Sequence, residues 1–212
     1  MAVRAVLFDF DGTLADSYAA ITASVNHVRA QVGLPPLTEP EVRRLVGHGL
    51  EQLMSVVAPQ LPADHACQLY RQHHPTVMNE LTRLLPGVPE TLHALHRRGL
   101  RLGVCSNKPA LFTAPLIETL GLGQVVSVVC GPSAEIAAKP APDMLHQAMR
   151  LLGVGPSETL YVGDMTVDVQ TGRAAGVRTL VIPTGSEDLA SLQAIKPDGI
   201  LRSFADLLEQ VG

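Results

Sequence analysis

The stretch that decides the fold is VRAVLFDFDGTL, residues 3–14. In it, an apolar run of strand-forming residues ends on two carboxylates, Asp9 and Asp11, which stand one residue apart. Buried parallel strands deliver acidic groups in this way to the carboxyl edge of a sheet, where open α/β folds bind their ligands. Two carboxylates so close would repel each other, and a hard divalent cation such as Mg²⁺ would neutralise them. An acidic turn after a strand is the simpler alternative.

Composition and charge limit the class of protein. The 212 residues suit one large domain, or a core with a sizeable insertion. The formal net charge is −4 and no basic run is present, so nucleic-acid binding has no electrostatic support. The three cysteines are widely spaced, without a CxxC pair, which is typical of reduced thiols in a cytoplasmic protein. Met1 leads almost directly into the first strand, which leaves no room for a signal peptide. No apolar run approaches the ~18 residues that span a bilayer. We therefore expect a cytoplasmic protein without a membrane segment.

From residue 86 onward, helical and strand patterns alternate. Helices are predicted over 88–98, 110–120, 142–152, 166–175 and 203–210, and strands over 101–105, 125–130, 159–163, 178–182 and near 199–201. Several of the helices end at a glycine that precedes an apolar strand. This rhythm is typical of βαβ units with right-handed crossovers around a parallel sheet. Together with strand 3–8, it predicts an α/β fold.

Residues from about 16 to 82 are predicted to be all-helical. Apolar residues recur at helical spacing in it, and Thr38 with Glu41 fits a capping box. A longer helical stretch runs from Ala63 to Leu85, and Pro75 is expected to kink or divide it. We expect residues 1–15 and 83–212 to form the core, and residues 16–82 to form a helical cap inserted after the first strand. Such a module would lie over the two carboxylates as a lid that excludes water.

Four of the predicted core strands, 3–8, 101–105, 125–130 and 159–163, are followed by residues that can do chemistry. Randomly scattered surface acids would not fall at successive strand ends, so the pattern predicts one site at one edge of the sheet. The residues that follow the strands are Asp9, Asp11, Ser106, Asn107, Lys139 and Asp164, with Asp168 one helical turn beyond Asp164.

Three of these residues fit the bond-making steps of phosphoryl transfer. Asp9 would attack as an oxygen nucleophile and form an aspartyl phosphate. Asp11 would protonate the leaving oxygen and then deprotonate the hydrolytic water. Mg²⁺, held by Asp9, Asp164 and the backbone carbonyl of Asp11, would neutralise the charge of the phosphate.

The remaining residues fit the binding of the phosphate. Ser106 and Lys139 would donate to its oxygens, and Lys139 would also keep Asp9 ionised. Gly12 and Asn107 are further candidates for contact with the phosphate or the substrate. Asp168 would act through a metal-bound water or through Lys139.

The residues DFDGTL at 9–14, SNK at 106–108, KPAP at 139–142, and Gly163-Asp164 with Asp168 resemble the four motifs of the haloacid dehalogenase superfamily. The order and the spacing agree over essentially the whole chain. The helical insertion resembles the C1 cap of the phosphoglycolate phosphatase and β-phosphoglucomutase branches. The resemblance implies a Rossmann-like, three-layer parallel-sheet core, Mg²⁺ dependence and the roles given above. Dehalogenases of the superfamily lack the second aspartate of the first motif, so Asp11 argues against cleavage of a carbon–halogen bond.

Two shorter stretches bear on the substrate. NKP at 107–109 and VGHGL at 46–50 look most like phosphoglycolate phosphatases. That similarity implies a phosphomonoesterase acting on a small phosphorylated metabolite, with 2-phosphoglycolate as the best single guess. One alternative is a phosphomutase of the β-phosphoglucomutase type, which protects its phosphoenzyme from water. Another is a non-catalytic regulatory or binding protein, which would have no need for the full set of site residues. Monomer and homodimer both stay open.

Some residues of the insertion have two interpretations. Residues 47–49, GHG, begin like a dinucleotide-binding loop, but they lack the third glycine and follow a helix. They are predicted to break the helix, and the functional alternative is a cap loop that points His48 at the substrate. Arg43 and Arg44 are expected to be solvated helix residues rather than clamps for a substrate carboxylate. Thr13 is expected to support the turn and Asp11.

Overall fold

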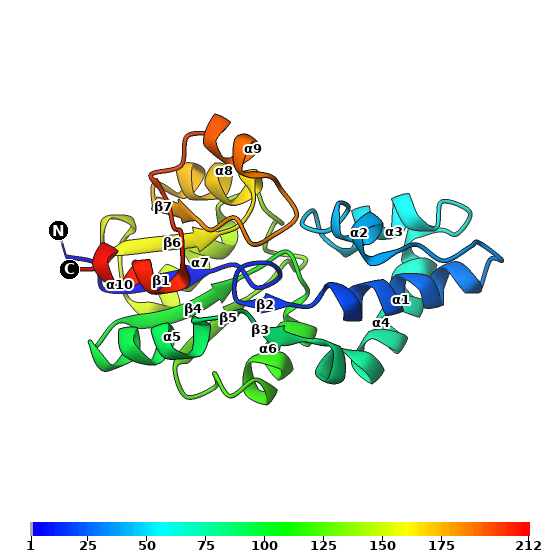
Figure 1. Ribbon diagram of the computed structural model, residues 1–212, viewed down its shortest axis with the longest axis horizontal. Coiled ribbons are helices and arrows are strands. Elements are labelled where there is room, and N and C mark those ends of the chain that lie inside the picture. Colours follow the sequence, from blue (N-terminus) through cyan, green and yellow to red (C-terminus); the bar gives the residue numbers. More distant parts are fainter. Residues whose placement is uncertain (1) are drawn as a thin grey trace.

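The computed structural model describes residues 2–212, and a six-stranded parallel sheet forms its centre (Figure 1). In spatial order the strands are β5 (Val126–Cys130), β4 (Arg101–Cys105), β1 (Ala5–Phe8), β6 (Thr159–Gly163), β7 (Arg178–Val181) and β8 (Gly199–Ile200). β1 lies between β4 and β6, with Ala5 opposite both Arg101 and Thr159. All four residues of β1 are buried, as expected for the inner strand of a sheet covered on both faces.

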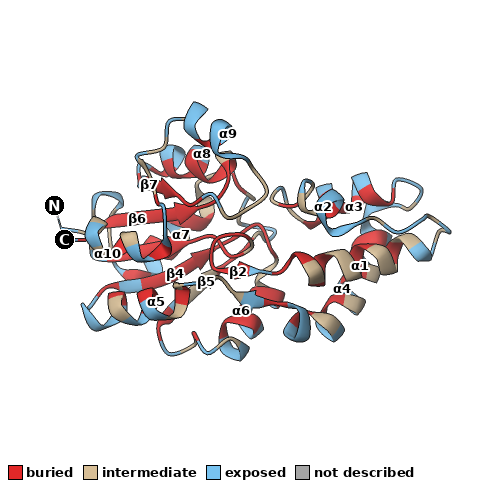
Figure 2. Ribbon diagram, in the orientation of Figure 1, coloured by how far each residue is buried: buried red, intermediate tan, exposed pale blue. Residues whose placement is uncertain are grey.

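Helices cover both faces of this sheet. α5 (Val88–Arg97), α6 (Ala110–Thr119) and α10 (Leu207–Gln210) lie on one face, and α7 (Asp143–Leu152) and α8 (Thr166–Ala175) lie on the other. Because side chains alternate along a strand, Val6 and Phe8 of β1 pack in the first layer, and Leu7 packs in the second. Figure 2 shows the buried sheet between helices whose outer sides are exposed. This three-layer arrangement confirms the predicted α/β, Rossmann-like fold class.

Most predicted elements of the core match the structure to within two residues at each end. The predicted C-terminal helix over 203–210 instead consists of a short 3₁₀ helix, η2 (Phe204–Asp206), followed by α10. α9 (Leu189–Ala194) was not predicted. Its signal was the side chain of Asp188, which caps the helix by accepting a hydrogen bond from the backbone nitrogen of Ser191 at 2.7 Å.

Four helices lie together at one end of the molecule, beyond the carboxyl edge of the sheet (Figure 1). They are α1 (Tyr18–Ala30), α2 (Glu39–Arg43), α3 (Leu50–Val57) and α4 (Ala63–Leu81). The predicted capping box is present, since the backbone nitrogen of Thr38 donates to Glu41 at 2.7 Å. The predicted division at Pro75 is wrong. α4 continues through that residue because its buried side packs along α1.

The predicted helical stretch up to Leu85 is also wrong at its end. Arg83–Leu84 forms a short strand, β3, which pairs antiparallel with β2 (Ala15–Asp16). Asp16 is therefore part of a strand and does not open the helical segment. The pairing joins the two stretches by which the chain leaves the sheet and returns to it. It supports our proposal that residues 16–82 form a cap on a core made of residues 1–15 and 83–212.

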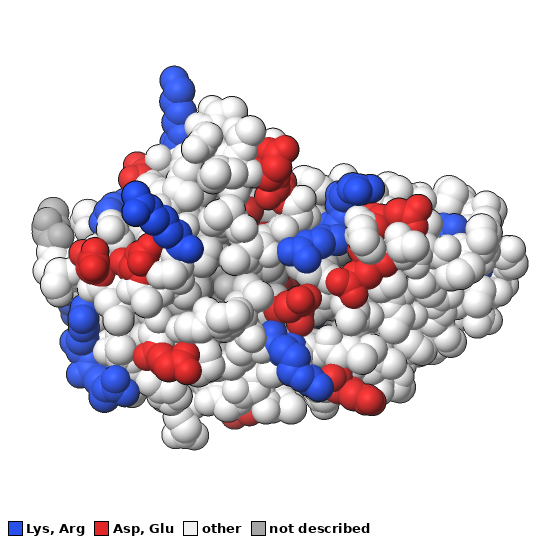
Figure 3. Space-filling view, viewed as in Figure 1, with Lys and Arg blue, Asp and Glu red and all other residues white. Residues whose placement is uncertain are grey.

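Among residues 2–212, no helix combines the length and the apolar character that a membrane crossing requires. On the face shown in Figure 3, basic and acidic side chains are interspersed rather than gathered by sign.

Buried His74 makes the stability of the fold depend on pH. Its ring packs between Tyr70 and Phe112, with Nδ1 2.9 Å from the hydroxyl of Ser24. Burial and, after it, the charge of Lys108 lower the pKa of His74 from 6.5 to about 2. Below about pH 6.5 the unfolded chain binds a proton that the folded chain does not. The contribution of His74 to the free energy of unfolding should therefore fall by about 2 kcal/mol between pH 7 and pH 5.

Urea unfolding at these two pH values tests this expectation. His74→Leu should reduce the loss of stability in acid by about 2 kcal/mol, whatever the variant does to stability near pH 7. His96→Gln removes an exposed histidine of α5 and should behave like the wild type. If His74→Leu loses as much free energy of unfolding in acid as the wild type, His74 does not cause the pH dependence.

Candidate active site

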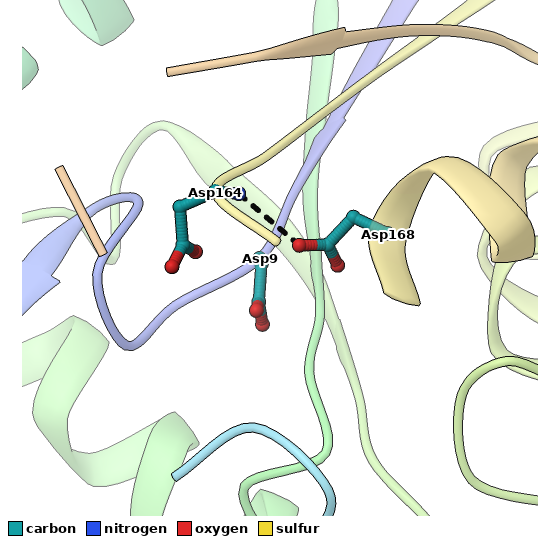
Figure 4. A group of neighbouring side chains, drawn as sticks. All are labelled: Asp9, Asp164 and Asp168. Atoms are coloured by element: carbon teal, nitrogen blue, oxygen red, sulfur yellow. Dashed lines mark hydrogen bonds between the residues drawn. The ribbon is translucent and has the colours of Figure 1, made fainter. Parts of the chain in front are cut away.

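Three buried carboxylates meet at the carboxyl ends of β1 and β6 (Figure 4). Asp9 follows β1, Asp164 follows β6, and Asp168 reaches in from the first turn of α8; one oxygen of each lies within 4.8 Å of the others. Oδ1 of Asp164 accepts a hydrogen bond from Thr13 at 2.6 Å. Oδ2 is buried and has no hydrogen-bond partner within residues 2–212. A buried, unpaired carboxylate oxygen beside two other carboxylates fits the oxygen ligands of a divalent cation.

The protein alone disfavours the ionised forms of these carboxyls. Burial, followed by the charges of Asp168 and Asp9, raises the pKa of Asp164 well above its usual range. Burial also raises the pKa of Asp9 to about 6, although the charge of Lys139 opposes this shift. A bound cation would reverse both effects because it stabilises the charged forms. The chemistry of the donor set therefore also fits a metal.

Lys139 connects Asp9 with Asp168. Its Nζ lies 2.9 Å from Oδ2 of Asp9 and 2.7 Å from Oδ1 of Asp168. It also donates to the hydroxyl of Tyr161 at 3.1 Å. Burial alone would lower the pKa of Lys139, but the charges of Asp168 and Asp9 outweigh it and hold that pKa above its ordinary value. The lysine is therefore a fixed positive charge next to Asp9.

Both carboxylate oxygens of Asp168 accept hydrogen bonds from other groups of the protein. Oδ1 accepts from Lys139 and, at 2.8 Å, from the hydroxyl of Tyr161. Oδ2 accepts from the backbone nitrogens of Asp164 at 3.1 Å, dashed in Figure 4, and Met165 at 3.0 Å. Asp168 was predicted to act either through a metal-bound water or through Lys139. These contacts favour the action through Lys139.

Asp11 lies apart from the three carboxylates and contacts a different lysine. The Nζ of Lys108 is 3.3 Å from its Oδ1 and 3.4 Å from its Oδ2, and the hydroxyl of Ser17 donates to Oδ1. The prediction that Thr13 supports Asp11 is wrong, because Thr13 donates to Asp164 instead. No role was predicted for Lys108 beyond its place in the motif SNK at 106–108. Its place directly after Ser106-Asn107, at a strand end, was the available signal.

The loop after β4 carries Ser106 and Asn107, and Asn107 contacts Lys139. The backbone nitrogen of Ser106 donates to Cys130 at 3.1 Å. The amide oxygen of Asn107 accepts from the backbone nitrogen of Lys139 at 2.8 Å, and its nitrogen donates to the carbonyl of Gly47 at 2.9 Å. Asn107 therefore ties together the β4 loop, the Lys139 loop and the helical segment. Its predicted contact with a phosphate stays a prediction.

A pocket opens over Asp9, Asp11 and Ser106, where the helical segment faces the sheet edge. Much of its remaining wall is apolar or aromatic, with Ile21, Val46, Leu50, Leu53, Tyr70 and Phe112, and Asn107 and Lys108 also line it. His48 is exposed and lines a neighbouring groove together with Arg71. The structure therefore does not bring His48 together with Asp9.

Two glycines pack against Asp164. Gly12 has a φ of +83°, and a Cβ there would lie 2.5 Å from Oδ2 of Asp164. A Cβ at Gly185 would lie 1.6 Å from the same oxygen. Neither position has room for a side chain while Asp164 keeps its place.

Arg43 joins the helical segment to the loop that contains Gly185. It donates to the carbonyls of Thr184 at 2.7 Å and Gly185 at 3.0 Å, and it stacks on Tyr18 at 4.3 Å from the ring centre. The prediction that Arg43 is a solvated helix residue is therefore wrong, whereas Arg44 is exposed. Sequence spacing could not show this contact, because Arg43 and Gly185 are 142 residues apart.

Comparisons with known proteins find a matching family, similar sequences and a similar fold. The sequence model of the family described as "Haloacid dehalogenase-like hydrolase" matches residues 6–182. The chain is 32% identical over 218 residues to the phosphoglycolate phosphatase of Yersinia pseudotuberculosis serotype I (strain IP32953), covering 100% of this chain and 94% of the relative. It is 32% identical to the phosphoglycolate phosphatase of Escherichia coli (strain K12), covering 99% and 93%. The crystal structure of a predicted phosphoglycolate phosphatase from Haemophilus somnus 129pt matches with a TM-score of 0.87 and 27% identity, covering 99% of this chain and 98% of that one.

Proposed function

The chain belongs to the haloacid dehalogenase-like hydrolases and is a phosphoric monoester hydrolase, and from this premise we propose a Mg²⁺-dependent reaction through an aspartyl phosphate on Asp9. The proposed substrate is a small phosphorylated metabolite, with 2-phosphoglycolate as the best single candidate. The observation that carries the proposal is the position of Asp9, 2.9 Å from the buried ammonium of Lys139 and beside the unpaired oxygen of Asp164.

The proposed chemistry has two displacements at phosphorus. A carboxylate oxygen of Asp9 attacks, the bond from phosphorus to the ester oxygen breaks, and Asp11 gives its proton to that oxygen. Asp11 then takes a proton from water, the water oxygen attacks phosphorus, and the bond to Asp9 breaks. The contacts of Asp11 with Ser17 and Lys108 hold it in place for both proton transfers.

Asp9 and Asp164, with the backbone carbonyl of Asp11, are the groups we propose to hold Mg²⁺. When bound, the cation supplies the positive charge that lets an anionic carboxylate approach an anionic phosphate. Ser106 and Lys139 donate hydrogen bonds to the phosphoryl oxygens, where charge develops in the transition state. Lys139 also fixes the orientation of Asp9, and Asp168 fixes Lys139.

Gly185→Ala should weaken the binding of the metal. The added methyl group would lie where Asp164 keeps its unpaired oxygen, so the carboxylate has to turn away. We expect at least a ~10-fold rise in the Mg²⁺ concentration that gives half-maximal activity. Gly155→Ala is the matched control, because the nearest atom to a Cβ there is 3.8 Å away. Titration of both variants with Mg²⁺ makes the comparison, and equal requirements would contradict the placement of the site.

A phosphatase panel tests the proposed function. Purified protein with Mg²⁺ is assayed against phosphates of two- and three-carbon acids, sugar phosphates, nucleotides and p-nitrophenyl phosphate, with and without a chelator. We expect hydrolysis of a small-acid phosphate that stops when the chelator is added. Transfer of the phosphoryl group to a sugar phosphate instead of water would establish the mutase alternative. No turnover of any ester would contradict the proposal.

A cytoplasmic location, and a monomeric or homodimeric state, stay part of the proposal.

A further inference from the structure

We propose that Lys108 binds a carboxylate of the substrate and thereby selects phosphate esters of short 2-hydroxy acids. This inference rests on the proposed function, because it concerns the part of the substrate that leaves with the ester oxygen. It depends on three features of the pocket: the contact of Lys108 with Asp11, the charges on the pocket walls, and the apolar character of the remaining surface.

The contact with Asp11 places Lys108 next to the leaving group. Asp11 has to reach the ester oxygen to protonate it, so the atoms bonded to that oxygen lie beside Asp11. The Nζ of Lys108 is 3.3 and 3.4 Å from the two oxygens of this carboxylate. In the ester of a 2-hydroxy acid, the carboxylate is attached to the carbon that carries the ester oxygen. A group that contacts Asp11 is therefore within reach of it.

Asp11 does not saturate the ammonium group. Charge-assisted hydrogen bonds between nitrogen and oxygen are usually 2.7–2.9 Å long, and both contacts of Lys108 are longer. An ammonium group has three N–H donors, which leaves at least one for a ligand. The side chain of Lys108 is only 4% exposed, so its donors face the interior of the site rather than bulk water.

Lys108 is also the single cation among the described residues that line the pocket, where the other charged residues are Asp9 and Asp11. Lys139 is not among the lining residues and lies beside Asp9, where it is proposed to contact the phosphoryl group, and Arg43 is engaged by backbone carbonyls. A substrate carboxylate that entered without Lys108 would meet carboxylates and apolar walls. Burial of a charge without a partner is strongly unfavourable, so Lys108 decides whether such a substrate binds.

The apolar walls argue against substrates with many hydroxyl groups. Ile21, Val46, Leu50, Leu53 and Phe112 offer no hydrogen-bonding side chain. The neutral polar side chains of the lining are Tyr70, Ser106 and Asn107, and Asn107 already bonds the backbone of Gly47 and Lys139. The several hydroxyls of a sugar phosphate would outnumber these partners, and those left over would lose their water partners without replacement. A short acid loses little, because its phosphate and its carboxylate both find cationic partners.

The test compares 2-phosphoglycolate with ethyl phosphate, which carries a methyl group in place of the carboxylate. We expect the wild type to prefer 2-phosphoglycolate by at least ~100-fold in kcat/KM, because the site pairs a charge that ethyl phosphate lacks. In Lys108→Met the preference should fall to ~10-fold or less, mainly through a higher KM for 2-phosphoglycolate. Lys108→Arg keeps the charge and should retain part of the preference. Arg71→Met removes a cation of the neighbouring groove and should keep all of it.

The ratio of the two substrates separates recognition from damage to Asp11 or to the fold. An equal loss on both substrates in Lys108→Met would mean that the lysine serves Asp11 alone, and this would overturn the inference. A wild type without preference for 2-phosphoglycolate would overturn it as well.

Calorimetry on the Asp9→Asn variant decides the same question without turnover. This variant should bind 2-phosphoglycolate more tightly than ethyl phosphate, and the added Lys108→Met change should abolish the difference. A difference that survives would overturn the inference. If the wild type hydrolyses no ester at all, the proposed function fails, and the binding difference still decides the role of Lys108.

Discussion

Asp9→Asn is expected to lower kcat by at least ~10⁴-fold, because the amide cannot act as the nucleophile that carries the phosphoryl group. Asparagine has nearly the same shape, so the fold and the hydrogen bond from the backbone nitrogen of Phe10, 2.7 Å long in the wild type, should persist. Steady-state kinetics with 2-phosphoglycolate at saturating Mg²⁺ measures the loss. Circular dichroism of the same sample monitors the fold.

The matched control is Asp16→Asn. Asp16 lies seven positions further along the chain, in β2, and is exposed. The chemical change is the same, so its kcat should stay close to that of the wild type. Full turnover by Asp9→Asn would remove Asp9 as the nucleophile, and an equal loss in both variants would mean that the effect is not specific to Asp9.

Lys139→Met should have the second large effect, on activity and on stability together. Without the ammonium group, the buried carboxylates of Asp9 and Asp168 lose the partner that lies 2.9 and 2.7 Å from them. Removal of one partner from a buried ionic cluster typically lowers the free energy of unfolding by about 3–5 kcal/mol. Loss of a donor to the phosphoryl group should lower kcat by at least ~10³-fold. Urea unfolding in the presence of a chelator measures the loss in the free energy of unfolding without a contribution from metal binding.

The double variant Lys139→Met/Asp168→Asn separates the two effects. Its neutral side chain at position 168 removes one of the unpaired charges, so part of the lost stability should return. Activity should stay low, because Lys139 is still absent from the phosphate. Recovery of activity in the double variant would contradict a direct contact of Lys139 with the phosphate.

The sequence predicted the core of the site because chemistry and topology coincide there. Asp9, Ser106 and Asp164 each stand directly after a strand, and parallel strands bring their carboxyl ends to one edge. The buried, apolar character of the strands then fixed the order of helices and strands over most of the chain. This is why the α/β fold class and the carboxylate cluster could both be predicted.

The residues that the sequence did not reveal act across long separations or from loops. Arg43 meets Gly185 only because the helical segment folds over the sheet edge, and nothing in the local pattern near either residue shows it. Lys108 was visible in a motif, but a loop side chain can point in several directions, and only the structure shows its contact with Asp11. β2 and β3 have two residues each, too few for an alternating pattern.

The central claim is that Asp9 carries the phosphoryl group, and one measurement tests it most directly. In Asp11→Asn the base for the second step is absent, whereas p-nitrophenyl phosphate has a leaving group that needs no acid in the first step. Acid quenching of this variant during turnover, followed by peptide mass spectrometry, should find one phosphoryl group on the peptide that contains Asp9. The phosphoryl group should be absent from this peptide when Asp9→Asn is combined with Asp11→Asn. A phosphoryl group on another residue, or turnover with no labelled peptide at all, would contradict the account.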